Sequence, residues 1–260
     1  MEPITESEVR KNIQSENTLR LLKCLEVDPF VEGYLNMANV TLMTHLGYND
    51  HGITHARIVT TSSAQIFHLL KNKIAFAVTE DLGLTEEDAE LAVVVGAFLH
   101  DIGNAVHRND HYIHGVILAK PILEQHLAQI YSGRTLAEMQ ALILQILYSH
   151  DEMVPAIIPE AGIVTVADGT DISAGRAKVP YAHGKIDIHS ISALSVQGLE
   201  ILPGEMKPVR LHVMMRESAG IFQVQEILGP KLTSSGLKEY IEVFVETIEK
   251  GGLVEELMIK

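Results

Sequence analysis

The spacing of apolar residues predicts that the first two thirds of the chain are helical. Apolar positions recur every three or four residues over much of 1–46, then from about Ile53 to Asn72 and from Thr85 to Leu99, as in helices that bury one face. The last of these segments begins with threonine and three acidic residues, a typical helix start, and continues as LAVVVGAFL. We therefore expect a deeply buried helix there.

Three more helices are expected after this buried helix. One starts near His111, a second extends from a capping box that begins at Thr135 to His150, and a third covers about 159–173. In the third helix Asp168 lies on an apolar stripe. Because a buried carboxylate without a partner is costly, Asp168 is expected to pair with another group or to bind a metal ion.

From about Lys185 the helical period gives way to short alternating segments, which are typical of strands. The segment GEMKP at 204–208 carries turn residues between two of them, and the pair Gly229-Pro230 is expected to end a helix. The predicted strands are IDI at 186–188, GLEI at 198–201, VRLHVMM at 209–215 and EYIEVFVETI at 239–248, and the predicted helix is AGIFQVQEIL at 219–228.

These patterns predict a mainly α protein with a small C-terminal α+β unit. We divide the chain into a helical domain, residues 1–184, and an α+β subdomain, residues 185–260. So small a sheet has few residues with which to cover both faces, so one face is expected to pack on the helical domain or on a second chain. Because exposed strand edges invite pairing, we expect a homodimer to which the C-terminal subdomain contributes contacts.

Composition narrows the classes of function. The formal net charge of −14 opposes binding to nucleic-acid polymers, which depends on clustered Lys and Arg. Cys24 is the single cysteine, so an internal disulfide and a thiolate metal site are both excluded. The longest apolar run, Leu91 to Leu99, is too short to cross a membrane, and the polar N-terminus does not resemble a signal peptide. We expect a cytoplasmic protein with a small substrate and no membrane association.

Histidine and aspartate residues at the ends of the predicted helices carry the candidate chemistry. His55 lies near the start of one helix, His100 and Asp101 close the buried helix, and Asp168 lies on an apolar face. Adjacent side chains of a regular helix point about 100° apart, so His100 and Asp101 share an ion only where the helix ends, and Gly103 is the expected stop. Imidazole together with carboxylate suits iron, manganese, nickel, cobalt or zinc.

Three segments that contain these residues resemble the motifs of one family. HARIV at 55–59, FLHDIGN at 98–104 and VADGTDIS at 166–173 are similar to the motifs of the HD-domain superfamily of metal-dependent phosphohydrolases, and the similarity extends over roughly residues 45–180. The resemblance implies an HD-domain helical bundle. It also implies four metal ligands, which are His55, His100, Asp101 and Asp168.

A subgroup of this superfamily with two metal ions, which includes the HD-GYP phosphodiesterases, implies further ligands. The matching positions here are His114 and His150, and His51 is a third candidate. The GYP segment is absent, because MVPAIIPE follows at 153–160, so cyclic-di-GMP is not an expected substrate. Asp151 is expected to be solvated. Other histidines, among them His45, His107, His111 and His126, are expected at the surface or behind the ligands.

The resemblance implies hydrolysis of a phosphomonoester or phosphodiester, in a small phosphorylated molecule or nucleotide, at two divalent transition-metal ions that Asp101 bridges. His100 and Asp101 are the expected catalytic residues. Arg57 is a candidate to assist them, and Arg176 and Lys178 are candidates for binding the substrate phosphate, although all three are equally well explained as surface charges. Two alternatives stay open: a mixed-valence di-iron oxygenase, as some relatives are, and a regulatory module that binds metal or nucleotide without turnover.

Overall fold

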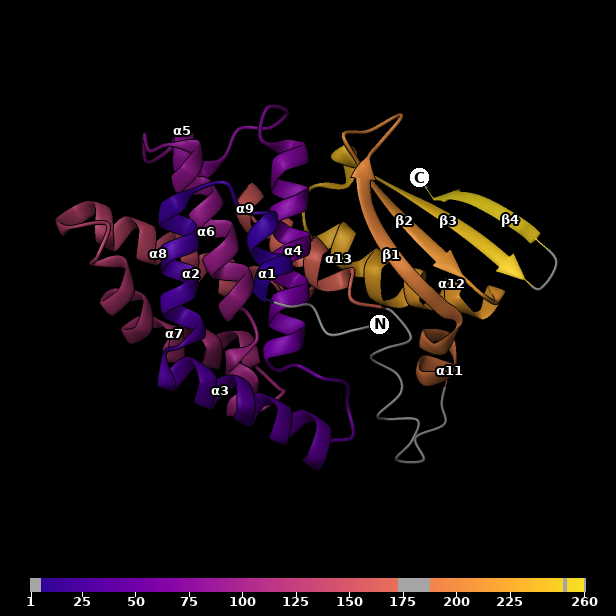
Figure 1. The fold of residues 1–260 in the computed structure, drawn as a ribbon, viewed down its shortest axis with the longest axis horizontal. Coiled ribbons are helices and arrows are strands. Elements are labelled where there is room, and N and C mark those ends of the chain that lie inside the picture. The colour runs from indigo at the N-terminus through magenta and orange to yellow at the C-terminus, as the bar shows by residue number, and fades with distance from the viewer. Residues whose placement is uncertain (1–5, 173–187, 250–251, 260) are drawn as a thin grey trace.

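The computed structural model describes residues 6–172, 188–249 and 252–259. Figure 1 shows helices on one side of the molecule and a four-stranded sheet on the other, with α13 between them. This confirms the predicted mainly α fold with a small C-terminal α+β unit.

All regular elements in the described residues of the first part of the chain are helices or helical turns. Its elements are α1 (Glu6–Lys11), α2 (Glu16–Glu26), α3 (Pro29–Asn39) with a π-helical turn (Val40–His45), α4 (Ile53–Leu70), α5 (Ala77–Glu80), α6 (Glu86–Leu99), a 3-10 turn (Ile102–Ala105), α7 (His111–Leu127), α8 (Gly133–Ser149) and α9 (Pro159–Gly169).

The C-terminal part combines short helices with the sheet. Its elements are α11 (Ile188–Ser195), β1 (Val196–Pro203), β2 (Val209–Met215), a 3-10 turn (Ser218–Gly220), α12 (Ile221–Gln223), a π-helical turn (Val224–Leu228), α13 (Gly229–Ser234), a 3-10 turn (Lys238–Tyr240), β3 (Ile241–Glu249) and β4 (Gly252–Ile259).

Helix α6 is the centre of the helical part. Thr85 and Asp88 form the predicted cap at its start, with the Asp88 backbone N–H donating to Thr85 Oγ1 at 3.2 Å, and every residue from 89 to 99 is buried. Gly96 lets α8 approach closely, because a Cβ there would lie 2.6 Å from Ile146 Cγ2. The helix is therefore fixed on all sides, and its C-terminal end carries His100 and Asp101 to a defined place.

One predicted helix start is wrong. The sequence suggests a capping box at Thr135, but α8 already begins at Gly133, with Ser132 as its N-cap residue. Gly133 adopts a φ of +55°, which glycine reaches without strain, so the chain turns into the helix two residues earlier. Glu138 instead accepts a hydrogen bond from Arg134, with Nε–Oε1 at 2.6 Å.

The C-terminal part differs from the prediction at three places. Ile188, the last residue of the predicted strand IDI, begins α11, and the other two residues, 186–187, lie outside the described part. Gly229 and Pro230 begin α13 where they were expected to end a helix, since the fixed φ of proline suits the first helical turn. Strand β4 was not predicted. The strands at 198–201, 209–215 and 239–248 are confirmed in β1, β2 and β3.

The sheet packs one face against the helices. The strand order is β1-β2-β3-β4, with β2 and β3 parallel and the outer pairs antiparallel. Alternate residues of β2, from Val209 to Met215, are buried, and they belong to the same hydrophobic cluster as the buried residues of α4 and α6. This agrees with the predicted packing on the helical domain. The boundary near 184 lies outside the described residues, and the homodimer stays a prediction that light scattering of the full chain tests.

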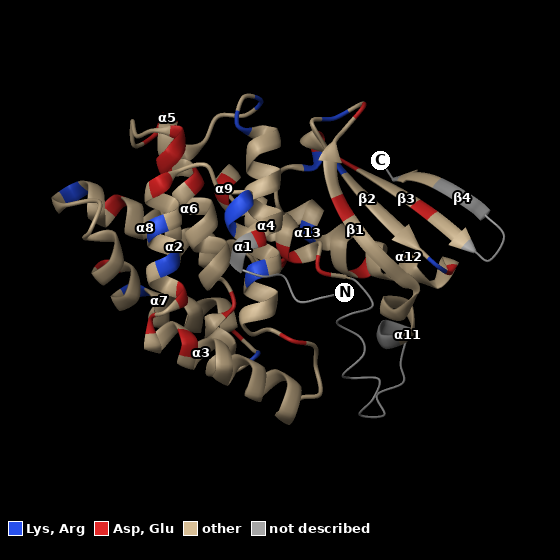
Figure 2. Cartoon of the chain, in the orientation of Figure 1, with Lys and Arg blue, Asp and Glu red and all other residues tan. Residues whose placement is uncertain are grey.

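Charges are spread over the surface of the molecule. In Figure 2 the Lys and Arg residues of the described part are scattered over the helices and over the loop after β1. Among the described residues, no helix combines the length and the apolar character that a membrane crossing requires.

A buried carboxylate fastens the N-terminal helices to α6. Glu90 accepts hydrogen bonds from the backbone N–H groups of Gln14 at 2.9 Å and Ser15 at 2.7 Å, and it lies 3.0 Å from His68 Nε2. Burial raises the pKa of Glu90, but the hydrogen bonds from His68 and the two backbone groups outweigh burial and hold the pKa below its usual value.

Replacing Glu90 with alanine is expected to lower the free energy of unfolding by about 3 kcal/mol at pH 7, because two buried N–H groups lose their acceptor. The contribution of a carboxyl with a lowered pKa is complete above its unfolded pKa of about 4.3 and is lost as the pH falls through the folded pKa. Urea unfolding at pH 7 and pH 3 tests this, with the exposed Glu87→Ala as control. An equal loss at both pH values would contradict it.

Candidate metal centre

The end of α6 presents two adjacent side chains to one region. His100 is the C-cap residue, and Asp101 has left the helix with φ −102° and ψ 3°. Asn104 donates to Asp101 Oδ1 at 2.7 Å and so holds that carboxylate in place. Gly103 is required where the helix ends, because a Cβ there would lie 1.9 Å from the carbonyl oxygen of His111. Its small size lets the start of α7 lie directly against this turn.

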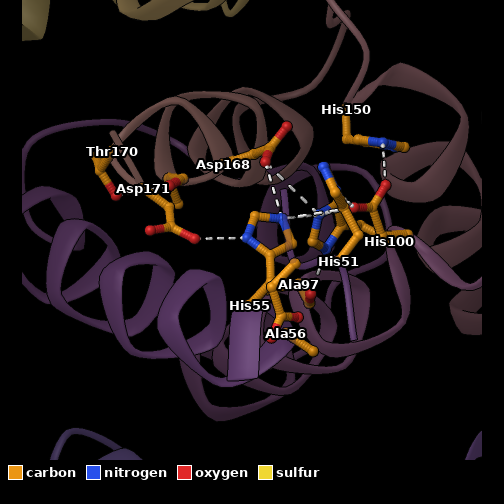
Figure 3. A network of polar contacts seen from close by, with 12 residues as sticks. His51, His55, Ala56, Ala97, His100, His150, Asp168, Thr170 and Asp171 are labelled. Atoms are coloured by element: carbon orange, nitrogen blue, oxygen red, sulfur yellow. Dashed lines mark hydrogen bonds and ion pairs between the residues drawn. The ribbon is translucent and has the colours of Figure 1, made fainter. Parts of the chain in front are cut away.

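A first cluster joins the four residues that the resemblance singled out. His55 from α4 places Nε2 at 3.2 Å from His100 Nε2, 3.2 Å from Asp168 Oδ1 and 3.4 Å from Asp101 Oδ2. Figure 3 shows the His55 ring between Asp168 and Asp171, with His100 beside it. The rings of His55 and His100 are buried. Segments that are far apart in the sequence therefore bring two imidazoles and two carboxylates together.

A second cluster lies on the other side of Asp101. His111 Nε2 lies 3.0 Å from His150 Nε2 and 3.4 Å from Asp101 Oδ1, and His150 Nε2 lies 3.7 Å from the same oxygen. Asp151 Oδ2 is 3.8 Å from His111 Nε2 and is buried, not solvated as expected. The two oxygens of Asp101 thus face different histidine pairs.

The structure places His111, and not His114, in this second cluster, which corrects both predictions for these residues. The buried stripe of α7 begins with His111, Gly115 and Ala119, spaced four residues apart. His114 lies beside this stripe, and it has no described contact with Asp101 or His150. The spacing of small and apolar residues after HYIH was the signal in the sequence that could have favoured His111.

His51 also reaches Asp101, although it lies before α4 begins. Its Nδ1 is 2.6 Å from Asp101 Oδ2, and its backbone N–H donates to Asn39 Oδ1 at 2.8 Å. Gly52 is the N-cap residue of α4, and a Cβ on it would lie 2.6 Å from Asn39 Nδ2. The end of α3 therefore fixes the position of His51 beside the first cluster.

Of the predicted basic residues, Arg57 lies in the described part of the chain, and it pairs outside the clusters. Arg57 Nε donates to Glu26 Oε1 at 3.0 Å, so α4 directs this side chain toward α2. This ion pair explains Arg57 as a structural charge and does not support the catalytic role considered for it. Arg176 and Lys178 lie outside the described residues.

Two residues of the site were missed in the sequence. Asp171 Oδ2 lies 2.8 Å from His55 Nδ1, and Lys231 Nζ from α13 donates to Asp168 Oδ2 at 2.6 Å. Asp171 belongs to the motif VADGTDIS, three residues after Asp168, so its position was a usable signal. Lys231 comes from the C-terminal part, and no local pattern connects it with Asp168.

The hydrogen bonds of the imidazoles fix their tautomers. Nδ1 of His100 lies 2.7 Å from the carbonyl oxygen of Ala97, and Nδ1 of His150 lies 2.6 Å from that of Leu147. A carbonyl oxygen only accepts, so each Nδ1 carries the proton. His111 contacts the carbonyl of Arg108 in the same way, at 3.1 Å, and Asp171 accepts from His55. Each Nε2 therefore directs a lone pair into the clusters.

The ionisation states also suit metal ligands. Burial lowers the pKa of His111 to about 3, and burial lowers that of His100 although Asp101 opposes the shift. Burial raises the pKa of Asp101, but neighbouring histidines, His100 first, outweigh burial and hold it well below its usual range. The pKa of Asp168 is likewise held low against burial, mainly by the charge of Lys231. Near neutral pH the rings of His100 and His111 are therefore neutral, and the carboxylates of Asp101 and Asp168 are ionised.

Replacing Asp171 with alanine is expected to weaken binding of zinc or cobalt to the first cluster roughly 10- to 100-fold, because such partners orient a metal-binding histidine. Isothermal titration of metal-free protein measures the change. Asp81→Ala, at an exposed aspartate after α5, is the matched control and should bind like the unchanged chain. Equal affinities in both variants would show that Asp171 does not act on His55.

Comparisons with known proteins agree with this geometry. The HD domain family matches residues 54–172. This range contains the residues of both clusters, whereas His51 and Lys231 lie outside it. An uncharacterised protein of Methanocaldococcus jannaschii is 39% identical over 230 residues, which are 88% of this chain and 89% of that protein. No solved structure matches significantly.

Proposed function

Because the chain belongs to the HD-domain superfamily, whose members are generally metal-dependent hydrolases, we propose that it is a phosphohydrolase with two divalent transition-metal ions. Its substrate in this proposal is a small phosphorylated molecule or a nucleotide, cleaved as a phosphomonoester or phosphodiester.

One observation carries the proposal, namely the close approach of two pairs of imidazole nitrogens. The Nε2 atoms of His55 and His100 are 3.2 Å apart, and those of His111 and His150 are 3.0 Å apart. With each Nδ1 protonated, these pairs direct lone pairs toward each other and repel unless a cation or proton lies between them. The low pKa values of His100 and His111 oppose a proton. Metal ions satisfy both pairs.

The chain's own residues divide into two ligand sets around Asp101. His55, His100 and Asp168 with Asp101 Oδ2 would hold the first ion, and His111 and His150 with Asp101 Oδ1 the second, with Asp151 close by. A pair of bridged ions supplies an activated water and neutralises charge on the phosphoryl group. His51 would orient Asp101 through its hydrogen bond.

The donor set restricts which metals fit. Imidazole nitrogens equal the carboxylate oxygens in the first set and outnumber them in the second, so iron, manganese, cobalt, nickel and zinc fit better than magnesium or calcium. The absence of thiolates in the sets agrees with the position of the single cysteine, Cys24, in α2.

A substrate screen that is repeated with each metal separately tests the proposal. Metal-free protein is loaded with each of the five metals and incubated with phosphomonoesters, nucleotides and phosphodiesters, and released phosphate or product is measured. Turnover that needs metal and disappears in His100→Ala is expected. Oxygen consumption by the iron-loaded protein, without phosphoester cleavage, would favour the di-iron oxygenase. Metal or nucleotide binding without any turnover would favour the regulatory module.

A further inference from the structure

Lys231 is a buried lysine of α13 whose side chain reaches the candidate metal centre. Its side chain is 10% exposed, and Nζ donates to Asp168 Oδ2 at 2.6 Å and to the carbonyl oxygen of His150 at 2.9 Å. Glu152 Oε2 lies 3.2 Å from Nζ. An ammonium group has three N–H donors, and here each has an acceptor. Lys231 therefore has no donor left over for a substrate phosphate.

The surface of α9 is shaped to receive this lysine. A Cβ on Gly169 would lie 3.1 Å from Lys231 Cβ, and a Cβ on Gly162 would lie 2.2 Å from the carbonyl oxygen of Ser235. The two glycines are seven residues apart, which is about two helical turns, so they lie on the same face. Both leave room for α13 and the residues after it. The helix that carries Asp168 thus allows the close approach of α13 through these two glycines.

The contact with Lys231 assigns separate roles to the two oxygens of Asp168. Oδ2 accepts from Lys231, whereas Oδ1 faces the Nε2 atoms of His55 at 3.2 Å and His100 at 3.7 Å. Removing a charge from water is costly unless it is paired. A lysine at this buried position is therefore explained by its partners, and not by packing alone.

We propose that Lys231 is a positioning residue that makes α13 part of the metal centre. By holding Oδ2, it keeps Oδ1 of Asp168 directed at the first ligand set, and through the carbonyl of His150 it also restrains the second. The inference rests on the proposed metal-binding function. It follows that metal binding depends on how the C-terminal part is seated on α9, beyond the range matched by the HD domain family.

Cobalt titration of the full chain tests this role, because the visible absorption of Co²⁺ responds to the arrangement of its ligands. Lys231→Met is expected to bind cobalt at the first site roughly 10- to 100-fold more weakly, the usual effect of losing a group that orients a ligand, with a changed absorption spectrum. Lys231→Arg keeps a cationic donor and is expected to restore the spectrum. Lys207→Met is the matched control, since the described hydrogen bonds of the Lys207 ammonium group go to the carbonyls of Lys238 and Ile241.

Circular dichroism and thermal unfolding show whether each variant is folded, and Lys231→Gln replaces the methionine variant if that one does not fold. An unchanged spectrum and affinity in the uncharged variant would overturn the inference. Equal changes in Lys231→Arg and the uncharged variant would also overturn it, since the effect would then be one of packing. If the unchanged chain binds no cobalt, the proposed function itself fails, and this inference with it.

Discussion

Replacing Asp101 with alanine is expected to remove both metal ions at once. Its two oxygens face different histidine pairs, Oδ2 toward His55 and Oδ1 toward His111, so neither set keeps its shared carboxylate. The first set then keeps Asp168 as its one carboxylate, and the second keeps only His111 and His150 of its assigned ligands, so both sets hold a divalent ion more weakly. Elemental analysis after loading should fall from two ions per chain to none.

The loss of activity should be correspondingly large. Metal ions contribute several kcal/mol of stabilisation to a phosphoryl-transfer transition state, so kcat/KM is expected to fall roughly 1000-fold or more. Asp81→Ala is the control, because this aspartate is exposed at the end of α5. Retention of one tightly bound ion in Asp101→Ala, in a chain with unchanged circular dichroism, would disprove the bridging role.

The second large effect distinguishes two histidines three residues apart. His111→Ala is expected to lower the metal content from two ions to one and to abolish most activity, because His111 Nε2 is one of the two imidazole nitrogens beside Asp101 Oδ1. His114→Ala is expected to keep both ions, since His114 lies beside the buried stripe of α7. Elemental analysis and substrate turnover of the two variants, measured together, check this.

The variants His111→Ala and His114→Ala serve as controls for each other, because both remove an imidazole from the first turn of the same helix. His150→Ala should behave like His111→Ala and keep the ion of the first set. If His114→Ala lost an ion and His111→Ala did not, the sequence-based assignment would be right and the geometry of the second set would be wrong.

Local signals in the sequence were sufficient for most helices and for the first ligand set. The cap at Thr85 and the apolar run after it specify α6, and the end of that helix follows from Gly103. His55, His100, Asp101 and Asp168 were recognisable because each lies within a short motif. These features depend on neighbouring residues in the chain, and so a sequence pattern records them.

The tertiary structure decided which atoms meet across the site. His111, and not His114, lies in the second cluster because of how α7 packs on the turn after α6. Arg57 pairs with Glu26 because α4 turns its side chain toward α2. Lys231 reaches Asp168 from 63 residues away only because two glycines let α13 approach α9. Such distances depend on the relative positions of whole helices, which are set by packing over many side chains and not by local spacing.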